Sequence, residues 1–483
     1  MKDPSSTRVL DQLPLPVDSK ATRRSTGARL LPARRAMVVL FGLIALTYIY
    51  YTHAALPPPG SLRDVDGANE IPLLGVPRTI QQSWVMYSPY YAAEPYISPP
   101  RGCSVDQVHI LQRHGARYPT SGAGTRIRTA IGKLQSVDHY TDPLLTFLKN
   151  YTYDLGQDNL IPFGAVQSFQ SGEQAFKRYA SLVTTDNQPF VRASGSPRVV
   201  DSASNWTAGF ADASHHRYNP ILSVILSEAG NDTLDDGMCA AAGSSDPQTN
   251  LWLSTFAPPL TARLNAAAPG ANLTDADTYS LLSMCAFDTV AHERPSPFCA
   301  LYKELNGGPG FAYTGDLDKY YGTGYGQPLG RVQGVGYVNE LLARLTGEPV
   351  QDHTQTNRTL DADPRTFPLG RGVYADFSHD NQMIAIFAAM GLFRQPQELD
   401  PTMPDPERTW RTERMVPFSA RMATERLKCS GGKENVRVLV NDAVMPLEFC
   451  GAKGDGVCTL DAFVESQVYA RNDGEGDWAK CFE

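Results

Sequence analysis

The sequence lacks three features that would each point to a definite class of protein. It has no CxxC pair and no compact cluster of metal-ligand residues, so neither a zinc site nor a dithiol redox site is expected. No internal repeat or long low-complexity tract is present. Basic charge is scarce after residue 35, where 35 Lys and Arg face 48 Asp and Glu. Such an acidic body does not suit nucleic acid, whose phosphates need a basic face.

The N-terminus, in contrast, is basic and leads into an apolar run. Residues 1–35 hold eight Lys and Arg against three Asp, and residues 36–56 are almost entirely apolar. About 20 residues at about 1.5 Å each can cross a bilayer. The basic flank predicts a cytoplasmic leader (1–35), a transmembrane signal-anchor (36–56), a stalk (57–80) and a body outside the cytosol. The alternative is a signal peptide cleaved near Ala54 or Ala55, which would release a secreted body.

Cysteines and glycosylation acceptors also favour a location of the body outside the cytosol. All eight cysteines follow the apolar run, an even number that predicts disulfide bonds rather than a metal site. Five acceptor motifs of the Asn-x-Thr type predict a glycoprotein. The acceptors are Asn150, Asn205, Asn231, Asn272 and Asn357.

The body is predicted to be α/β, with strands and helices alternating near both ends around a longer insertion. Residues 334–346 carry apolar side chains at helical spacing, and residues 383–393 form an apolar stretch typical of a buried helix. Strands are predicted at 105–112, 372–377 and 436–440. The segment from about 125 to 345 mixes helical stretches with loops and is expected to form a second lobe.

Three polar segments lie near predicted strand ends, where ligands bind in open α/β sheets. They are RHGAR at 113–117, RASGSPR at 192–198 and SHDN at 378–381. Each segment also has a plain alternative. The alternatives are a charged surface loop for RHGAR, a turn with two arginines for RASGSPR and a helix cap for SHDN. Together they supply an imidazole, a carboxyl group and several arginines. That set fits attack on phosphorus, because arginine binds phosphate oxygens and keeps a nearby histidine neutral.

RHGARYP at 113–119, taken with the later His-Asp pair, resembles the signature of the histidine acid phosphatases, and the longer string resembles their fungal phytase branch. The likeness runs from about residue 81 to the C-terminus and implies one catalytic domain over 81–483. That domain would have the phosphoglycerate-mutase-like α/β sandwich fold with an inserted, mainly helical lobe. Supporting segments are QSWVMYSPYY, VRASGSPRVV, SPFCALY, KYYGTGYGQPLG, QGVGYVNELLARLTGEPV, TFPLGRGVYADFSHDN and VRVLVNDAVMPL.

The resemblance implies a role for each matching residue. His114 would attack phosphorus, and Asp380 would protonate the leaving alcohol and then help to activate water. His379 would donate a hydrogen bond to the phosphate. The clamp for the phosphate oxygens would be Arg113, Arg117 and Arg198. Arg192 would be structural, and no cofactor or metal is implied.

The resemblance also implies the pairing of the cysteines and a substrate. The expected bridges are Cys103–Cys429, Cys239–Cys481, Cys285–Cys299 and Cys450–Cys458. Phytate is the first expected substrate and a broad range of phosphomonoesters the second, because basic residues outside the clamp are few. Candidate specificity residues are Arg126, Arg128 and Lys319; the alternative for the two arginines is a solvated helix face.

Two further hypotheses come from other classes, namely an inert membrane-tethered binding protein and a phosphate-transferring mutase. The intact motifs argue against the first, and a secretory chain is a poor setting for the second. Since Asp380 must be protonated to act as an acid, we expect an acidic optimum, with activity falling above about pH 6–7.

Overall fold

The computed structural model describes residues 74–483. The predicted leader, the signal-anchor and most of the stalk lie outside the described residues. Within residues 74–483, none of the helices is both long enough and apolar enough to cross a bilayer.

The centre of the protein is one mixed sheet with the order β3-β2-β4-β1-β5-β6-β7, and β8 pairs with β6. The first four strands of this order run parallel, and the others are joined antiparallel. The last seven residues of β1 are buried, as expected of a central strand with both faces covered. The strands are β1 (Cys103–Arg113), β2 (Phe190–Ser194), β3 (Leu222–Leu226), β4 (Val373–Ser378), β5 (Arg421–Cys429), β6 (Glu434–Val440), β7 (Ala443–Val444) and β8 (Cys458–Thr459).

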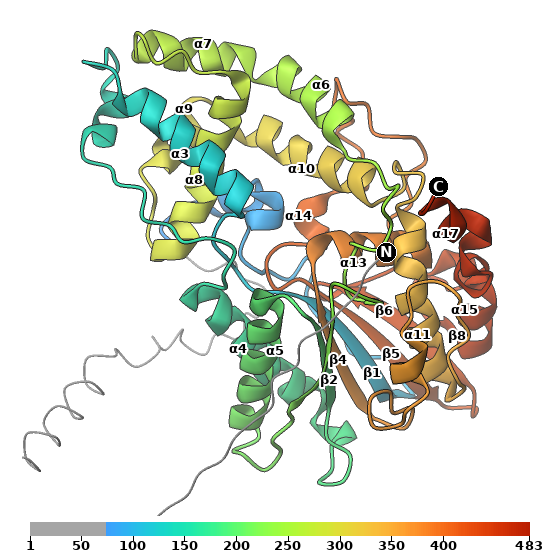
Figure 1. Cartoon of the computed structure of the whole chain (residues 1–483). Helices are drawn as coiled ribbons and strands as arrows, with labels where there is room; N and C mark the ends of the chain where they lie inside the picture. Colours follow the sequence, from blue (N-terminus) through green and yellow to red (C-terminus); the bar gives the residue numbers. More distant parts are fainter. Residues whose placement is uncertain (1–73) are drawn as a thin grey trace, which may run out of the picture. The chain divides into compact units, whose positions relative to one another are not determined.

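Helices cover both faces of the sheet (Figure 1). On one face, α4 (Pro162–Tyr179) and α5 (Pro197–Ala213) enclose a core with Val108 and Ile110 of β1. On the other, α11 (Val335–Thr346) and α13 (Asp380–Met390) pack against Leu111. The predicted α/β sandwich is therefore confirmed.

A separate group of helices forms the second lobe, around its own apolar core (Figure 1). Its members are α3 (Ser121–Gln135), α6 (Asp246–Phe256), α7 (Pro258–Ala267), α8 (Asp275–His292), α9 (Phe298–Glu304) and α10 (Gly308–Gly322). The helices of this lobe come from two separate stretches of the chain, because β2, α5 and β3 return to the sheet between α3 and α6. Short helices complete the fold at α2 (Arg78–Gln82), α12 (Arg358–Asp361), α14 (Thr412–Met415), α15 (Leu460–Ser466), α16 (Val468–Arg471) and α17 (Asp477–Lys480).

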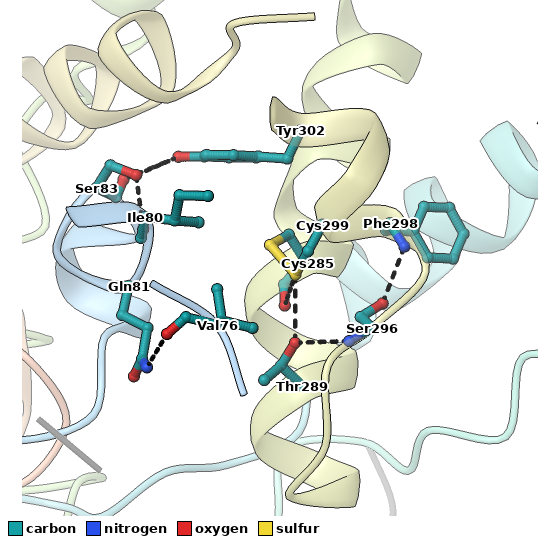
Figure 2. The surroundings of a disulfide bond; sticks show 10 residues. All are labelled: Val76, Ile80, Gln81, Ser83, Cys285, Thr289, Ser296, Phe298, Cys299 and Tyr302. Carbon is teal, nitrogen blue, oxygen red and sulfur yellow. Dashed lines mark hydrogen bonds between the residues drawn. A yellow bond between two sulfur atoms is a disulfide. The ribbon is translucent and has the colours of Figure 1, made fainter. Parts of the chain in front are cut away.

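The packed body begins earlier than the expected boundary at residue 81. Leu74 and Val76 are buried in the core of the helical lobe, and α2 starts at Arg78. Figure 2 shows this segment beside α8 and α9, where Ser83 exchanges a hydrogen bond with the hydroxyl of Tyr302 at 2.9 Å. Residues 74–80 thus belong to the folded body and not to a stalk.

Four disulfides join all eight cysteines, in the pairing that the resemblance implies. Cys103–Cys429 links β1 to β5 at residues that already face each other in the sheet. Cys285–Cys299 closes the turn between α8 and α9 (Figure 2). The other two are Cys239–Cys481 and Cys450–Cys458.

Candidate active site

The three polar segments meet at the carboxyl ends of the parallel strands. His114 directly follows β1, Arg198 lies in the first turn of α5 just after β2, and His379 follows β4. The helical lobe reaches the same place, because Lys319 of α10 contacts Asp380. The site therefore lies between the sheet edge and the second lobe.

His114 is held as a neutral imidazole. Its Nδ1 lies 2.8 Å from the carbonyl oxygen of Gly115, which can only accept, so Nδ1 carries the hydrogen and Nε2 keeps its lone pair. Burial, reinforced by the positive charges of Arg113 and Arg117, holds the pKa of His114 well below its ordinary value. Nε2 therefore keeps the free lone pair that a nucleophile requires.

Close backbone packing fixes the loop that carries His114. A Cβ at Gly115 would lie 2.2 Å from the carbonyl oxygen of Gly164 in α4, so only glycine fits. The Gly115 N–H donates to the hydroxyl of Ser202 in α5 at 3.0 Å. Both helices of this face thus set the position of the imidazole.

Three arginines surround His114. The Arg113 side chain is fully buried and donates to the carbonyl oxygens of Met86 and Val416, while its guanidinium lies 4.7 Å from the centre of the Phe418 ring. Burial lowers the pKa of Arg113 to about 10, still well above neutral pH. Within residues 74–483, the buried Nε atoms of Arg117 and Arg198 have no hydrogen-bond partner. Such unpaired donors suit an anion.

Asp380 begins α13 and is held by two cations. Its Oδ2 lies 3.2 Å from Nη2 of Arg113 and 3.1 Å from Nζ of Lys319. Burial alone would raise the pKa of Asp380, but these two charges outweigh it and hold the pKa well below its ordinary value. The carboxyl group is therefore ionised before substrate binds.

Position 380 was expected to fall before the predicted helix at 383–393. The helix instead starts at Asp380, after His379 as N-cap, and ends at Met390 because Gly391 takes a left-handed conformation with φ of 86°. This shift places the carboxyl group in the first helical turn.

His379 is oriented by a carboxylate that the sequence did not reveal. Its Nδ1 lies 3.3 Å from Nη2 of Arg198, which can only donate, so Nε2 carries the hydrogen and donates to Oε1 of Glu228 at 2.9 Å. The hydrogen bond from His379 lowers the pKa of Glu228 to about 2. The rings of His114 and His379 are 5.7 Å apart.

The three candidate specificity residues lie in different settings. Lys319 is buried and also bonds Oδ1 of Asn381 at 2.6 Å, so it belongs to the centre of the site and not to an outer pocket. Arg128 is exposed and lies 5.4 Å from the centre of the Tyr153 ring. Arg126 is exposed, and its charge acts on Tyr279 of the helical lobe.

Sequence reasoning missed several residues that the structure brings to the site. Glu228 and Asp235 flank His379, and Tyr87 lies in the field of Arg117, Lys319 and Asp380. Glu228 and Asp235 occupy an irregular segment after β3, which has neither periodicity nor a motif. QSWVMYSPYY, which contains Tyr87, was the one available signal, but it did not single out this tyrosine.

Comparisons with known proteins agree with this geometry. The profile of the histidine phosphatase superfamily (branch 2) matches residues 104–441. Phytase A of Aspergillus fumigatus is 41% identical over 422 residues, covering 83% of this chain and 90% of the relative. Phytase A of Emericella nidulans is also 41% identical, covering 83% of this chain and 91% of the relative.

Among solved structures, the phytase from D. castellii matches with a TM-score of 0.70 at 21% identity. It covers 86% of this chain and 90% of that one, which supports the fold. The chain belongs to branch 2 of the histidine phosphatase superfamily and is a phosphoric monoester hydrolase.

Proposed function

We propose that the protein is a phytase, which hydrolyses phosphate esters of myo-inositol through a phosphohistidine on His114. The observation that carries this proposal is the convergence of a neutral imidazole, three arginines and a His-Asp pair on one buried point. The relatives named Phytase A support phytate as the substrate.

The first step would transfer the phosphoryl group to the protein. Arg113, Arg117 and Arg198 would bind the phosphate oxygens and stabilise the charge of the transition state. Nε2 of His114 would form the bond to phosphorus as the ester P–O bond breaks. Asp380 would give its proton to the departing alcohol oxygen.

The second step would reverse the role of Asp380. Its carboxylate would take a proton from water as the water oxygen attacks the phosphohistidine. The N–P bond breaks, inorganic phosphate leaves, and Asp380 is again protonated for the next cycle.

Asp380 can be protonated in the complex because bound phosphate brings negative charge to Arg113 and to the site around it. That charge offsets the cations that hold the free carboxylate ionised. We expect activity to fall above about pH 6–7, when the complex loses this proton. A rate profile that stays flat to about pH 8 would contradict this role.

A broad acid phosphatase is the second candidate. Lys319 is engaged by Asp380 and Asp318, and Arg128 lies against Tyr153, so few free cations remain for the outer phosphates of phytate. The ratio of kcat/KM for phytate to that for an aryl phosphate decides between the two. A ratio well above one supports the phytase.

The chemistry itself is tested by trapping the intermediate. Labelled substrate should leave phosphate on the wild-type protein after an alkaline quench, because phosphohistidine survives alkali and is lost in acid. His114→Ala should abolish labelling and turnover. His139→Ala, which removes an exposed imidazole of the helical lobe, should change neither. Turnover that survives His114→Ala would rule out the proposed nucleophile.

For location, we propose that the catalytic body lies outside the cytosol, either anchored through residues 36–56 or released by cleavage near Ala54. Four disulfides support an oxidising compartment. Asn150, Asn231 and Asn272 are exposed, and Asn205 and Asn357 are partly exposed, which supports glycosylation. N-terminal sequencing of the membrane and medium fractions distinguishes the anchored form from the released one.

A further inference from the structure

A chain of hydrogen bonds leads from the phosphate site to a buried carboxyl group that touches none of the clamp residues. Ser194, at the end of β2, has its Oγ 2.9 Å from Oε1 of Glu228 and 2.8 Å from Oδ2 of Asp232. Glu228 in turn accepts from His379. The Asp232 side chain is fully buried, and its Oδ1 accepts from the N–H of Leu234 at 2.8 Å.

The serine can satisfy only one of its two carboxylate neighbours. A hydroxyl has a single hydrogen, so with both acids ionised the serine donates either to Oε1 of Glu228, which also accepts from His379 and from the N–H of Ser196, or to Oδ2 of Asp232, and the other contact is left without a hydrogen. When Asp232 is protonated, its O–H donates to Ser194 and the serine donates to Glu228. Every contact in the chain is then satisfied, and one buried negative charge is gone.

We propose that Asp232 is a positioning residue whose protonation directs the Ser194 hydroxyl toward Glu228 and thereby strengthens phosphate binding beside His379. This inference deepens the proposed function and rests on it. When Asp232 is protonated, the serine hydroxyl donates to Glu228, which is the carboxylate that accepts from His379. When Asp232 is ionised, the hydroxyl donates to Asp232 instead, and a negative charge lies behind the site that binds the anion.

Burial, more than the charged groups around it, favours the neutral form of Asp232 near pH 6. Burial raises the pKa of Asp232 to about 6, with a smaller upward contribution from Asp235 on the same loop. Arg192 of β2 acts in the opposite direction, but its guanidinium is already engaged by Glu340 and Asp376. Glu228 and His379 face Asp232 through the serine.

Asp232→Asn tests the proposal, because the amide keeps the acceptor for Leu234 and gives Ser194 a permanent donor. We measure the dissociation constant of inorganic phosphate by calorimetry from pH 4.5 to 7. The protonation of free phosphate is the same in both experiments. A change with pH in the ratio of the two dissociation constants therefore reflects the protein and not the ligand. The two constants should agree near pH 4.5, and by pH 7 the variant should bind about threefold to tenfold more tightly than wild type.

A ratio that does not change with pH overturns the proposal. Asp212→Asn, which removes an exposed carboxylate at the end of α5, is the matched control and should give a ratio near one throughout. In a Ser194→Ala background the effect of Asp232→Asn should be much smaller, since the connecting hydroxyl is absent. An undiminished effect would refute the role of the serine.

Stability provides a readout that needs no ligand. A carboxyl group whose folded pKa is raised stabilises the protein below its unfolded pKa and loses that contribution as pH rises through the folded value of about 6. The Tm of wild type relative to Asp232→Asn should therefore fall between about pH 4 and pH 7. A constant difference in Tm would show that Asp232 does not titrate there. Wild-type turnover at pH 4.5 tests the proposed function separately.

Discussion

At the scale of single residues, the proposed role of Asp380 depends on which of its two carboxyl oxygens carries the proton. Both cations contact Oδ2, so Oδ1 is the oxygen that would be protonated and would donate to the leaving alcohol. Arg113 is also a member of the proposed phosphate clamp, whereas Lys319 comes from the helical lobe and bonds Asn381 as well. A substitution at Lys319 can therefore change the pKa of Asp380 without removing a residue of the proposed clamp.

Lys319→Gln should move the basic limb of the kcat profile to higher pH by about half a unit to one unit, because loss of the positive charge raises the pKa of Asp380. A kcat profile from pH 4 to 8 measures this. Lys133→Gln, which removes a partly buried lysine that pairs with Asp277 within the helical lobe, should leave the limb in place. A limb that moves to lower pH would contradict the assignment of Asp380 as the acid.

At the scale of elements, the position of His114 depends on how closely α4 approaches the end of β1. Gly115→Ala places a Cβ 2.2 Å from the carbonyl oxygen of Gly164, so one backbone segment must move and carry His114 with it. We expect kcat to fall by about 100-fold, as a displacement near 1 Å can cost that much. Gly132→Ala is the control, because α3 leaves open space at that Cβ and the change should stabilise the helix by about 0.5–1 kcal/mol. Normal kcat for Gly115→Ala would show that the loop is not fixed by this contact.

The elements that the sequence predicted best are those with a clear period or a motif. Strands β1 and β4 and helix α11 lie where the apolar patterns placed them, and RHGAR and SHDN meet as expected. Helix α13 begins three residues before the predicted apolar stretch, because the polar residues 380–382 form its first turn, with His379 at the N-cap position. An apolar pattern carries no information about such a turn.

The residues around His379 could not have been found in this way. Glu228 and Asp232 reach the site through the pairing of β3 with β2, a contact between distant parts of the chain. The segment between them has no regular structure, and neither carboxyl group stands out among many surface acids. Their roles come from burial and from the single hydroxyl that they share, which only the folded chain reveals.

At the scale of the whole molecule, the Cys239–Cys481 bond fastens the C-terminus to the segment that follows β3. That segment carries Glu228 and Asp232, and the N–H of Asp232 donates to the sulfur of Met238, the neighbour of Cys239. The bond closes a loop of 242 residues, against only eight for Cys450–Cys458. Loop-closure entropy therefore predicts a larger stabilisation from the longer loop.

Replacing both Cys239 and Cys481 with alanine should lower the free energy of unfolding by about 2–5 kcal/mol, and the same change at Cys450 and Cys458 should cost less. The variant without the Cys239–Cys481 bond should also show a functional effect, because the freed segment holds the carboxylate that orients His379. We expect its KM to rise while its kcat changes little. Denaturant unfolding and steady-state kinetics on the two double variants measure both effects. If the two variants lose equal stability and keep the wild-type KM, the C-terminus is not what holds the segment after β3 against the site.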